Sequence, residues 1–452
     1  MTVEATDHLE DAVLPYGKQR VKRGGMWYTP VSGIWQTVWL EAVPSVYIHA
    51  LRTDVCLSPD LTSATLRITA ESLTEGLPEG FTEANTEGTV LITSPDGELT
   101  APLTDGVATV TIAHPRLWSP EDPYLYACTV TAGEDRVESY FAVRSLTVQS
   151  FEGIPRLCLN GKPYFFHALL DQGYFEGGIF APPDPAAYER DILTAKALGF
   201  NTLRKHIKVE PEQFYYDCDR LGMVVFQDMV NNGPYSFLRD TALPTVGLKK
   251  RSDKHLHRHK ATRAAFLEGM KTTVERLRNH PCVCYWTIFN EGWGQFEGNR
   301  AYETLRQWDD TRFIDTVSGW FKGPDSDVDS EHIYFKPVKL TYGDKPMVLS
   351  EFGGYACKIE GHAFKPDGAY GYRFFTNRAD FEDALVKLYE EEIIPAARAG
   401  LCAAVYTQLT DVEDEVNGLV TYDREVVKVS PQRMKPIAEA LYRAVSATDC
   451  NG

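Results

Sequence analysis

From about residue 155 onward the sequence alternates short apolar segments with amphipathic segments of helical period, and this alternation limits the fold more than any other feature. Such a pattern predicts parallel βα units. The predicted helices are Pro185–Leu198, Pro211–Leu221, Thr262–Arg278, Phe381–Ala399 and Pro431–Ala444. The predicted strands are Tyr164–Ala168, Thr202–His206, Val224–Gln227, Val283–Phe289, Phe313–Thr316, His332–Phe335, Met347–Leu349 and Ala403–Thr407. Eight parallel strands fit a (β/α)8 TIM barrel, in which functional side chains lie at the C-terminal ends of the strands.

Two of these apolar strands lead into a glutamate. The segment WTIFNEGWGQF places Glu291 after the fourth strand, and PMVLSEFGGY places Glu351 after the seventh. Burying an unpaired ionised glutamate costs several kcal/mol, so each residue either meets solvent at an ordinary strand end or has a functional reason to be there. Two carboxylates on one barrel rim are what glycoside cleavage requires. A separation of about 5 to 5.5 Å would mean retention of configuration and about 6.5 to 9.5 Å inversion, and the sequence leaves both open.

Composition excludes several classes of partner. The chain has 46 Lys and Arg against 63 Asp and Glu, a net charge of −17, which argues against binding nucleic acid or anionic membranes. No apolar run approaches the roughly 18 to 20 residues of a membrane span, and the acidic start of the sequence lacks a signal core. Nine cysteines without CxxC spacing favour free thiols in a reducing compartment. We therefore expect a cytoplasmic protein.

Residues 45–149 have a different texture. Short β-rich segments such as SATLRITAES and GTVLIT alternate there with clusters of Gly, Pro, Asp and Thr, and no helical pattern appears. This spacing predicts an immunoglobulin-like β-sandwich in front of a barrel that occupies residues 150–452.

The sequence resembles glycoside hydrolase family 2, a group of retaining exo-β-glycosidases. SGIWQTVWLE is similar to the end of the family's N-terminal sugar-binding jelly roll, RNHPCVCYWTIFNEGWGQF to its acid/base segment, and PMVLSEFGGY to its nucleophile segment. GFNTLRKHIKVEPEQFYYDCDRLGMVVFQD is similar to its second and third barrel strands. The paired glutamate motifs, in this order and spacing, make the resemblance specific.

The resemblance implies roles for four residues. Glu291 would be the general acid that protonates the leaving oxygen and then activates water as a base, whereas Glu351 would be the ionised nucleophile. Arg204 would lie beside Glu351, where its positive charge favours the carboxylate form, although a surface ion pair is the alternative for this arginine. Asn290 would bind the sugar 2-hydroxyl.

Six further side chains near predicted strand ends could contact a sugar. A tyrosine on the sixth strand is similar to a family tyrosine near the nucleophile, two aspartates follow the first and third strands, and three aromatic residues could offer a face to the ring. Core packing explains the tyrosine of the sixth strand equally well, and loop solvation or helix capping explains the two aspartates equally well. For the three aromatic residues, packing is the default interpretation. These residues are Tyr334, Asp171, Asp228, Trp293, Trp320 and Tyr355.

No metal or other cofactor is expected. The segment HLHRH, residues 255–259, carries three histidines, but no Cys, Asp or Glu cluster nearby completes a tetrahedral set, so a solvated basic loop is the better interpretation.

The sequence departs from the family at its front. Only the last jelly-roll strands are expected, in residues 1–44, which would leave Trp27, Trp35 and Trp39 without cover. Either the chain is a fragment, or a partner protein or second copy of the chain covers this surface.

Three functional hypotheses follow. A retaining β-galactosidase acting on oligosaccharides or glycoconjugates leads, partly because the sequence lacks the Asn-x-Lys signature by which family glucuronidases hold a uronate carboxylate. A β-glucuronidase or β-mannosidase is the enzymatic alternative. A non-catalytic carbohydrate-binding remnant is the alternative from another class.

Overall fold

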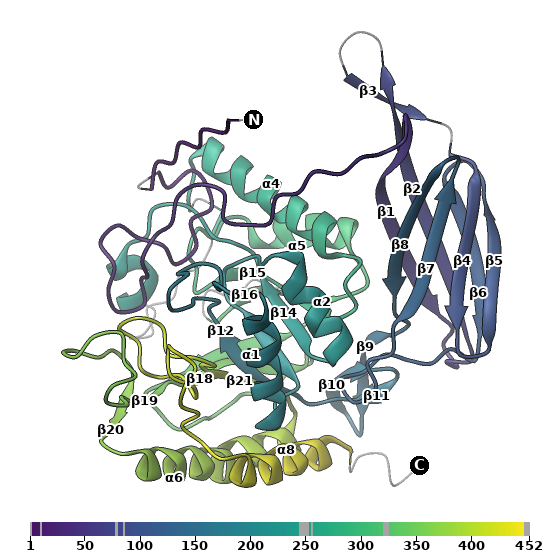
Figure 1. Ribbon diagram of the computed structural model, residues 1–452. Helices are drawn as coiled ribbons and strands as arrows, with labels where there is room; N and C mark the ends of the chain where they lie inside the picture. Colours follow the sequence, from purple (N-terminus) through teal and green to yellow (C-terminus); the bar gives the residue numbers. More distant parts are fainter. Residues whose placement is uncertain are drawn as a thin grey trace.

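The structure is a computed structural model that describes residues 2–9, 11–76, 80–84, 86–243, 253–254, 256–319 and 325–446. Figure 1 shows an irregular N-terminal segment, a β-sandwich set to one side, and a larger domain that carries the helices. The expected fold class, an all-β part followed by a TIM barrel, is confirmed.

Eight parallel strands form the barrel. Their hydrogen-bonded order is β16-β15-β14-β13-β12-β21-β18-β17, and β16 packs against β17, so the ring is nearly closed. The strands are β12 (Phe166–Asp171), β13 (Thr202–Lys205), β14 (Val224–Asp228), β15 (Val283–Asn290), β16 (Phe313–Ser318), β17 (Asp329–Ile333), β18 (Met347–Gly353) and β21 (Leu401–Thr407). Each predicted strand overlaps one of them.

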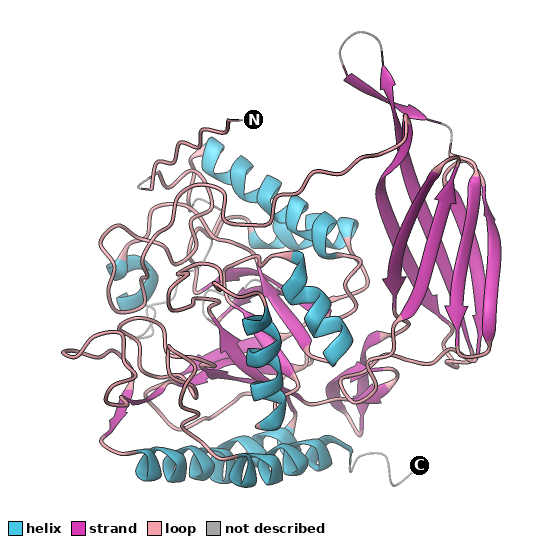
Figure 2. Cartoon of the chain, in the orientation of Figure 1, coloured by secondary structure: helices cyan, strands magenta, loops and turns pink. Residues whose placement is uncertain are grey.

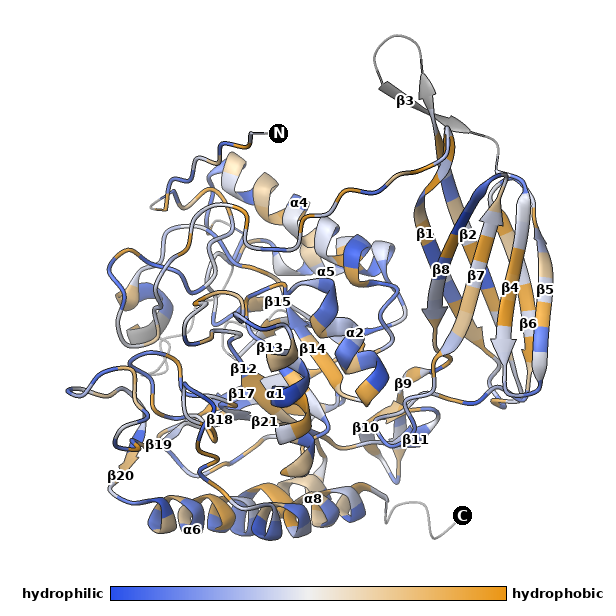
Figure 3. Cartoon of the chain, viewed as in Figure 1, coloured by the Kyte–Doolittle hydropathy of each residue, from blue (hydrophilic) through white to orange (hydrophobic). Residues whose placement is uncertain are grey.

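The helices surround this ring. They are α1 (Ala186–Ala197), α2 (Glu212–Leu221), α4 (Lys260–Leu277), α5 (Gly298–Trp308), α6 (Arg378–Leu388), α7 (Ile394–Ala399) and α8 (Pro431–Ser446). The helix predicted over 381–399 is divided into α6 and α7 by a π-helical turn at Tyr389–Ile393. Figure 3 shows β14 as mostly hydrophobic, whereas the outer helix α6 alternates between hydrophilic and hydrophobic residues, as expected for a helix with one solvated face.

The sandwich consists of two antiparallel sheets, which Figure 2 shows as strands without helices. One sheet joins β1 (Val46–Leu57), β2 (Ser63–Gly76), β3 (Gly80–Ala84) and β6 (Val107–Ala113). The other joins β4 (Gly88–Ser94), β5 (Gly97–Leu103), β7 (Tyr126–Ala132) and β8 (Asp135–Phe141). Alternate residues of β6, namely Ala108, Val110 and Ile112, are buried, which is the period of a strand with one face toward a core.

The sandwich is fixed to the barrel through a small sheet and several buried polar contacts. The connecting sheet contains β9 (Leu146–Phe151), β10 (Ile154–Leu159) and β11 (Lys162–Pro163). The indole N–H of Trp118 donates to the backbone oxygen of Asp219 at 2.8 Å. Arg144 donates to the backbone oxygens of Pro281 and Val283 at 2.7 and 2.8 Å. The Trp118 contact joins the sandwich to α2, and the Arg144 contacts join it to the start of β15, the strand that leads to Glu291.

Residues 11–44 of the N-terminal segment contain only isolated bridges, such as Gln19 with Tyr28. Two of the three tryptophans expected to lack cover have partners in the barrel domain. Trp27 stacks on Trp293 with ring centres 5.1 Å apart, and Trp35 packs edge-on against Phe180 at 4.5 Å. Trp39 is 70 % exposed. The interpretation of this segment as a jelly-roll remnant stays a prediction.

Among the described residues, no helix combines the length and apolar character needed to cross a membrane.

Candidate active site

The turn after β15 explains why Asn290 and Glu291 are followed by glycines. Glu291 has a left-handed backbone, with φ of 51°, and Gly292 and Gly294 follow with φ of 74° and 66°. A Cβ on Gly294 would lie 2.5 Å from the backbone oxygen of Asn232, so a larger residue would clash there. A left-handed glutamate is costly unless the surrounding structure holds it. The turn therefore holds Glu291 in an unfavourable backbone conformation, and this conformation positions its carboxylate.

Glu351 lies on β18 and is 5 % exposed. Nη1 of Arg204 donates to its Oε1 at 3.1 Å, and the hydroxyl of Tyr334 donates to its Oε2. Burial alone would raise the pKa of Glu351, but His332 and Arg204 outweigh it and lower the pKa to about 2. Glu351 is therefore ionised at neutral pH.

Arg204, on β13, connects Glu351 to the ends of β14 and β15. Its Nε donates to Oδ1 of Asp228 at 3.0 Å, and its Nη2 donates to Oδ1 of Asn290 at 2.9 Å. The other oxygen of Asp228 lies 2.7 Å from Nδ1 of His206. Burial would raise the pKa of Asp228, but Arg204 and His206 lower it to about 2. The expected contact between Arg204 and Glu351 is present, and Asp228 has protein partners on both oxygens.

His332 bridges the two glutamates and was not identified from the sequence. Its Nδ1 lies 2.9 Å from Oε1 of Glu291 and 3.6 Å from Oε2 of Glu351, while its Nε2 lies 3.0 Å from Oγ of Ser318. One signal could have revealed it: His332 precedes Tyr334 by two residues, and side chains two apart on a strand share a face. The same spacing links His206 to Arg204.

Tyr334 lies between Glu351 and the end of β21. Besides Glu351, its hydroxyl contacts Oγ1 of Thr407 at 3.0 Å. The ring of Tyr372 stacks on Tyr334 with centres 4.0 Å apart and planes 8° from parallel. A cis peptide bond joins Thr407 to Gln408. The sixth, seventh and eighth barrel strands thus meet around one carboxylate.

Glu291, His332 and Glu351 also have the composition of a metal site, because each offers one ligand atom and these atoms lie within 4.8 Å of one another. Nδ1 of His332 is hydrogen-bonded to Glu291, and Glu351 accepts from Tyr334, so protein groups already serve these atoms. The expected absence of a catalytic metal stays a prediction. Of the predicted histidine run, residue 255 lies outside the described residues, and His259 accepts from the N–H of Thr262 at the start of α4.

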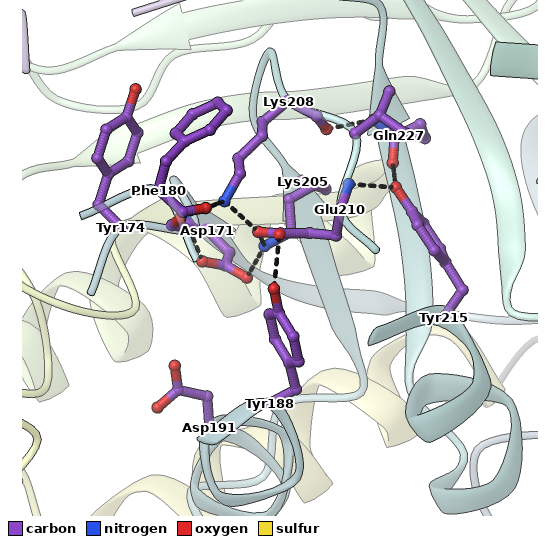
Figure 4. A network of polar contacts seen from close by, with 12 residues as sticks. Asp171, Tyr174, Phe180, Tyr188, Asp191, Lys205, Lys208, Glu210, Tyr215 and Gln227 are labelled. Atoms are coloured by element: carbon purple, nitrogen blue, oxygen red, sulfur yellow. Dashed lines mark hydrogen bonds and ion pairs between the residues drawn. The ribbon is translucent and has the colours of Figure 1, made fainter. Parts of the chain in front are cut away.

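Asp171 lies in a separate buried cluster, shown in Figure 4. Its Oδ2 accepts from the ammonium of Lys205 at 2.5 Å, and its Oδ1 accepts from the N–H of Gly173. Its predicted contact with substrate stays a prediction. Among the described residues, Asp171 therefore makes no contact with Glu291 or Glu351.

The predicted aromatic contacts have different surroundings. Trp293 is 1 % exposed and stacks on Trp27, and Tyr355 is 9 % exposed with the guanidinium of Arg373 over its ring at 5.3 Å. Trp320 lies outside the described residues. A role in sugar binding stays a prediction for all three predicted residues.

The geometry can support nucleophilic attack coupled to proton transfer. Glu351 is an ionised carboxylate held by an arginine and a tyrosine, and Glu291 is a second carboxyl group oriented by a histidine. The two carboxyl groups approach within 4.8 Å. A bond between them could be attacked from one side and protonated from the other.

Two family models match the chain, and both carry the same family description. The model of the glycosyl hydrolases family 2 TIM barrel domain matches residues 156–367, and the glycosyl hydrolases family 2 model matches residues 46–144. The matched ranges contain both glutamates and most of the sandwich.

Individual relatives give the same picture at low identity. A β-galactosidase of Aeromonas hydrophila is 30% identical over 225 residues, which cover 48% of this chain and 20% of the relative. A β-mannosidase B of Emericella nidulans is 27% identical over 283 residues, covering 58% and 30%. A solved β-D-glucuronidase of Dictyoglomus thermophilum superposes with a TM-score of 0.64 at 18% identity, covering 88% of this chain and 69% of that one. The chain thus spans less than a third of the length of these two curated relatives.

Proposed function

The chain belongs to glycosyl hydrolase family 2, and from this premise we propose that it is a retaining exo-β-glycosidase that acts by double displacement. Glu351 is the nucleophile in this proposal, and Glu291 is the acid and base. The substrate is the terminal sugar of an oligosaccharide or glycoconjugate.

The separation of the two carboxyl groups carries the proposal. Oxygens of Glu291 and Glu351 lie within 4.8 Å of each other. Retaining enzymes keep their carboxyl groups about 5 to 5.5 Å apart so that one can attack the anomeric carbon directly, whereas inverting enzymes leave about 6.5 to 9.5 Å for a water molecule. The observed approach favours direct attack.

In the first half-reaction, a carboxylate oxygen of Glu351 forms a bond to the anomeric carbon as the bond to the leaving oxygen breaks. Glu291 gives its proton to that oxygen. Arg204 and Tyr334 keep Glu351 ionised and oriented before the attack. In the second half-reaction, Glu291 takes a proton from water, and the resulting nucleophile releases the sugar from Glu351 with retained configuration.

Asn290 has the group needed to hold the sugar. Its side-chain oxygen accepts from Arg204 at 2.9 Å, so the amide nitrogen is left to donate to a substrate hydroxyl. A contact to the 2-hydroxyl would strengthen in the transition state, because positive charge develops on the sugar ring.

We propose a β-galactoside as the substrate. Names of the sequence relatives include β-galactosidase and β-mannosidase, and the compared structure is a β-glucuronidase. The β-mannoside and β-glucuronide are therefore the enzymatic alternatives that an assay must include.

A panel of aryl β-galactoside, β-glucuronide, β-mannoside and β-glucoside tests the proposal, with the Glu351→Gln variant as the blank. We expect turnover of one sugar and, by proton NMR at early times, a first product of β configuration. An α product would contradict double displacement. No turnover from folded protein would favour the non-catalytic carbohydrate-binding alternative.

Two further proposals concern the setting of the protein. We propose that it acts in the cytoplasm. We also propose that a second copy or a partner protein covers the surface around Trp39 and Leu40, which are 70 % and 92 % exposed. Analytical ultracentrifugation of the wild type beside a Trp39→Ser variant tests the latter, because only a covered surface would make the assembly sensitive to this change.

A further inference from the structure

The N-terminal segment reaches the barrel at the ends of several strands. The N–H groups of Tyr16 and Gly17 lie 3.2 and 3.3 Å from the backbone oxygen of Asn231, which follows β14. A Cβ on Gly17 would come 2.8 Å from the backbone oxygen of Ile207, which follows β13, so the segment lies directly against that loop. Figure 1 shows this purple segment looping over the barrel before it crosses to the sandwich. The residues that follow Gly17 are therefore placed beside the catalytic ends of the strands.

Lys18 is 8 % exposed, and no carboxylate of the described residues lies within ion-pair distance of its ammonium. Its Nζ lies 5.0 Å from the ring centre of Trp293, two residues beyond Glu291. Within the described ranges, its ammonium makes no hydrogen bond and no ion pair. A buried charge without such partners is costly, so water or a ligand must supply them.

Other buried lysines of the protein show what a structural ion pair looks like here. Lys205 lies 2.5 Å from Asp171, Lys208 lies 2.8 Å from Glu210, and Lys428 lies 2.6 Å from Asp411. Each of these three lysine side chains is at most 2 % exposed. Lys18 is also buried but makes no such ion pair among the described residues, which argues against a purely structural role.

Glu415 is the matching half-satisfied carboxylate. Its Oε2 accepts from the hydroxyl of Tyr28 and from Nε2 of Gln408, the latter at 3.1 Å. No donor among the described residues contacts its Oε1. Burial raises the pKa of Glu415, and Lys18 acts against that rise, so the two charges are close enough to interact. The backbone agrees, because the N–H of Tyr28 donates to the carbonyl of Lys18 at 3.0 Å.

These two groups also lie near the catalytic carboxylates. The charge of Glu351 contributes to the raised pKa of Glu415, and the charge of Lys18 contributes to the lowered pKa of His206. His206 contacts Asp228, which in turn contacts Arg204. Together with the contact of Lys18 to Trp293, two residues beyond Glu291, this places Lys18 and Glu415 beside the site that holds Glu351 and Arg204.

We propose that Lys18 and Glu415 bind hydroxyl groups of the terminal sugar, with the ammonium donating to one oxygen and Oε1 of the carboxylate accepting from a hydroxyl. This inference rests on the proposed glycosidase function and names the substrate class. A neutral pyranose can both accept from Lys18 and donate to Glu415. A uronate carboxylate would add an anion where Glu415 already faces the ammonium, and is therefore disfavoured.

Two variants and a matched control test the proposal. Lys18→Met and Glu415→Gln remove one charge each and keep the side-chain size, and Lys22→Met is the control because Lys22 is an exposed lysine of the same segment. The assay uses the aryl β-glycoside that the wild type hydrolyses, together with its singly deoxygenated analogues. Thermal melting of every variant checks that it is folded.

We expect Lys18→Met to lower kcat/KM on the parent glycoside by roughly 10- to 100-fold, the value of a hydrogen bond to a charged group. One analogue lacks the hydroxyl that Lys18 would bind. On this analogue, kcat/KM of Lys18→Met should be less than about 3-fold below that of the wild type, because the interaction is already missing from both. Glu415→Gln should likewise lower kcat/KM on the parent glycoside but hardly on one deoxy analogue, which should lack a different or adjacent hydroxyl. Lys22→Met should match the wild type on every substrate.

Equal losses on the parent and on every deoxy analogue would overturn the proposal, because a structural defect does not distinguish hydroxyl groups. A wild type that prefers the β-galacturonide to the β-galactoside, and loses this preference in Lys18→Met, would overturn the neutral-sugar assignment. If the wild type hydrolyses none of the glycosides, the proposed function fails, and calorimetry with free galactose, mannose and glucose decides the inference. At least one sugar should then bind the wild type roughly 10-fold or more tightly than Lys18→Met; equal binding, or no binding of any sugar, would overturn the inference.

Discussion

Arg204 and Lys205 are neighbours on β13, both are fully buried, and they build two charged clusters on opposite faces of one strand. Arg204 enters the barrel and contacts Asp228, Asn290 and Glu351. The ammonium of Lys205 lies 4.2 Å from the ring centre of Phe214 on α2, in the layer between the barrel and its helices. Successive side chains of a strand point to opposite faces, so one strand can serve both.

The Lys205 cluster is closed on itself, as Figure 4 shows. Oε1 of Glu210 accepts from both Lys205 and Lys208, and its Oε2 accepts from the hydroxyl of Tyr188 on α1. Lys208 also donates to the backbone oxygens of Gly173 and Phe180. Each charge is met by protein groups, and the cluster fastens the loop after β12 to α1.

The two clusters teach that burial and charge do not by themselves identify an active site. Both contain buried carboxylates and cations at hydrogen-bonding distance. What differs is the unused hydrogen-bonding capacity. Among the described residues, the side-chain nitrogen of Asn290 has no partner, and the carboxylate of Glu291 is hydrogen-bonded to His332 alone. In the Lys205 cluster, the charged donors and acceptors bind one another. Three substitutions and one acid titration would break or sharpen this comparison.

The largest effect should come from Glu351→Gln. Loss of the proposed nucleophile should lower kcat by at least about 10⁴-fold, because the covalent step would have no substitute. Circular dichroism and thermal melting should show a folded protein, since the amide can still accept from Arg204. Full activity in this variant would remove Glu351 from the mechanism.

Glu210→Gln should lower the stability of the protein and leave its activity nearly unchanged. Removing the shared carboxylate leaves Lys205 and Lys208 with less compensating charge in a buried setting, which typically costs about 3–5 kcal/mol in the free energy of unfolding. Urea denaturation measures this loss. In the folded fraction, kcat should stay within a few-fold of the wild type, and a selective loss of kcat at full stability would mean that the second cluster takes part in catalysis.

Acid titration should show how much the charge of Glu351 contributes to stability. The pKa of Glu351 is about 2 in the folded protein against 4.5 as its ordinary value, so its contribution to stability is present above pH 4.5 and is lost as the pH falls through 2. The contribution is on the order of 3 kcal/mol. Urea denaturation between pH 5 and 2 should therefore have a smaller pH slope in Glu351→Gln than in the wild type; identical slopes would contradict the low pKa.

Tyr334→Phe should have the smallest of the four effects. The change removes the hydrogen bonds to Glu351 and Thr407 but leaves the ring stacked on Tyr372. A hydrogen bond to a charged group is worth about 1.5–3 kcal/mol, so kcat/KM should fall roughly 10- to 100-fold. Tyr372→Phe is the matched control, because among the described residues the hydroxyl of Tyr372 makes no hydrogen bond to Glu351. A larger loss in this control would shift the role to Tyr372.

The sequence predicted the barrel strands well because their apolar runs are long and are bounded by clear breaks. It missed α5, whose residues GNRAYETLRQW are mostly polar and which begins after a left-handed Glu297 without a side-chain cap. Its apolar residues Ala301, Leu305 and Trp308 are nevertheless spaced by four and three residues, the period of a helix with one buried face, so this spacing was the signal that could have found it.

The residues of the candidate site also fall into those that the sequence predicted and those that it did not. Glu291, Glu351 and Arg204 were predictable because they follow or end apolar strands, and the barrel brings such ends together. Glu415 was not identified, because its position depends on the turn after β21, which the pattern does not fix. His332 was also missed, although its two-residue spacing from Tyr334 could have revealed it. Lys18 lies in a segment without regular structure, so no periodicity could relate it to the barrel.

The contact between Tyr28 and Glu415 joins residues 387 positions apart in the chain. During synthesis on the ribosome, residues 16–28 emerge long before the eighth barrel strand exists. They can reach their final place only after that strand and the turn behind it have formed, and such distant pairings are slow to make. The segment made early would thus be among the last to dock, and a nascent chain could fold its sandwich well before it could bind a sugar.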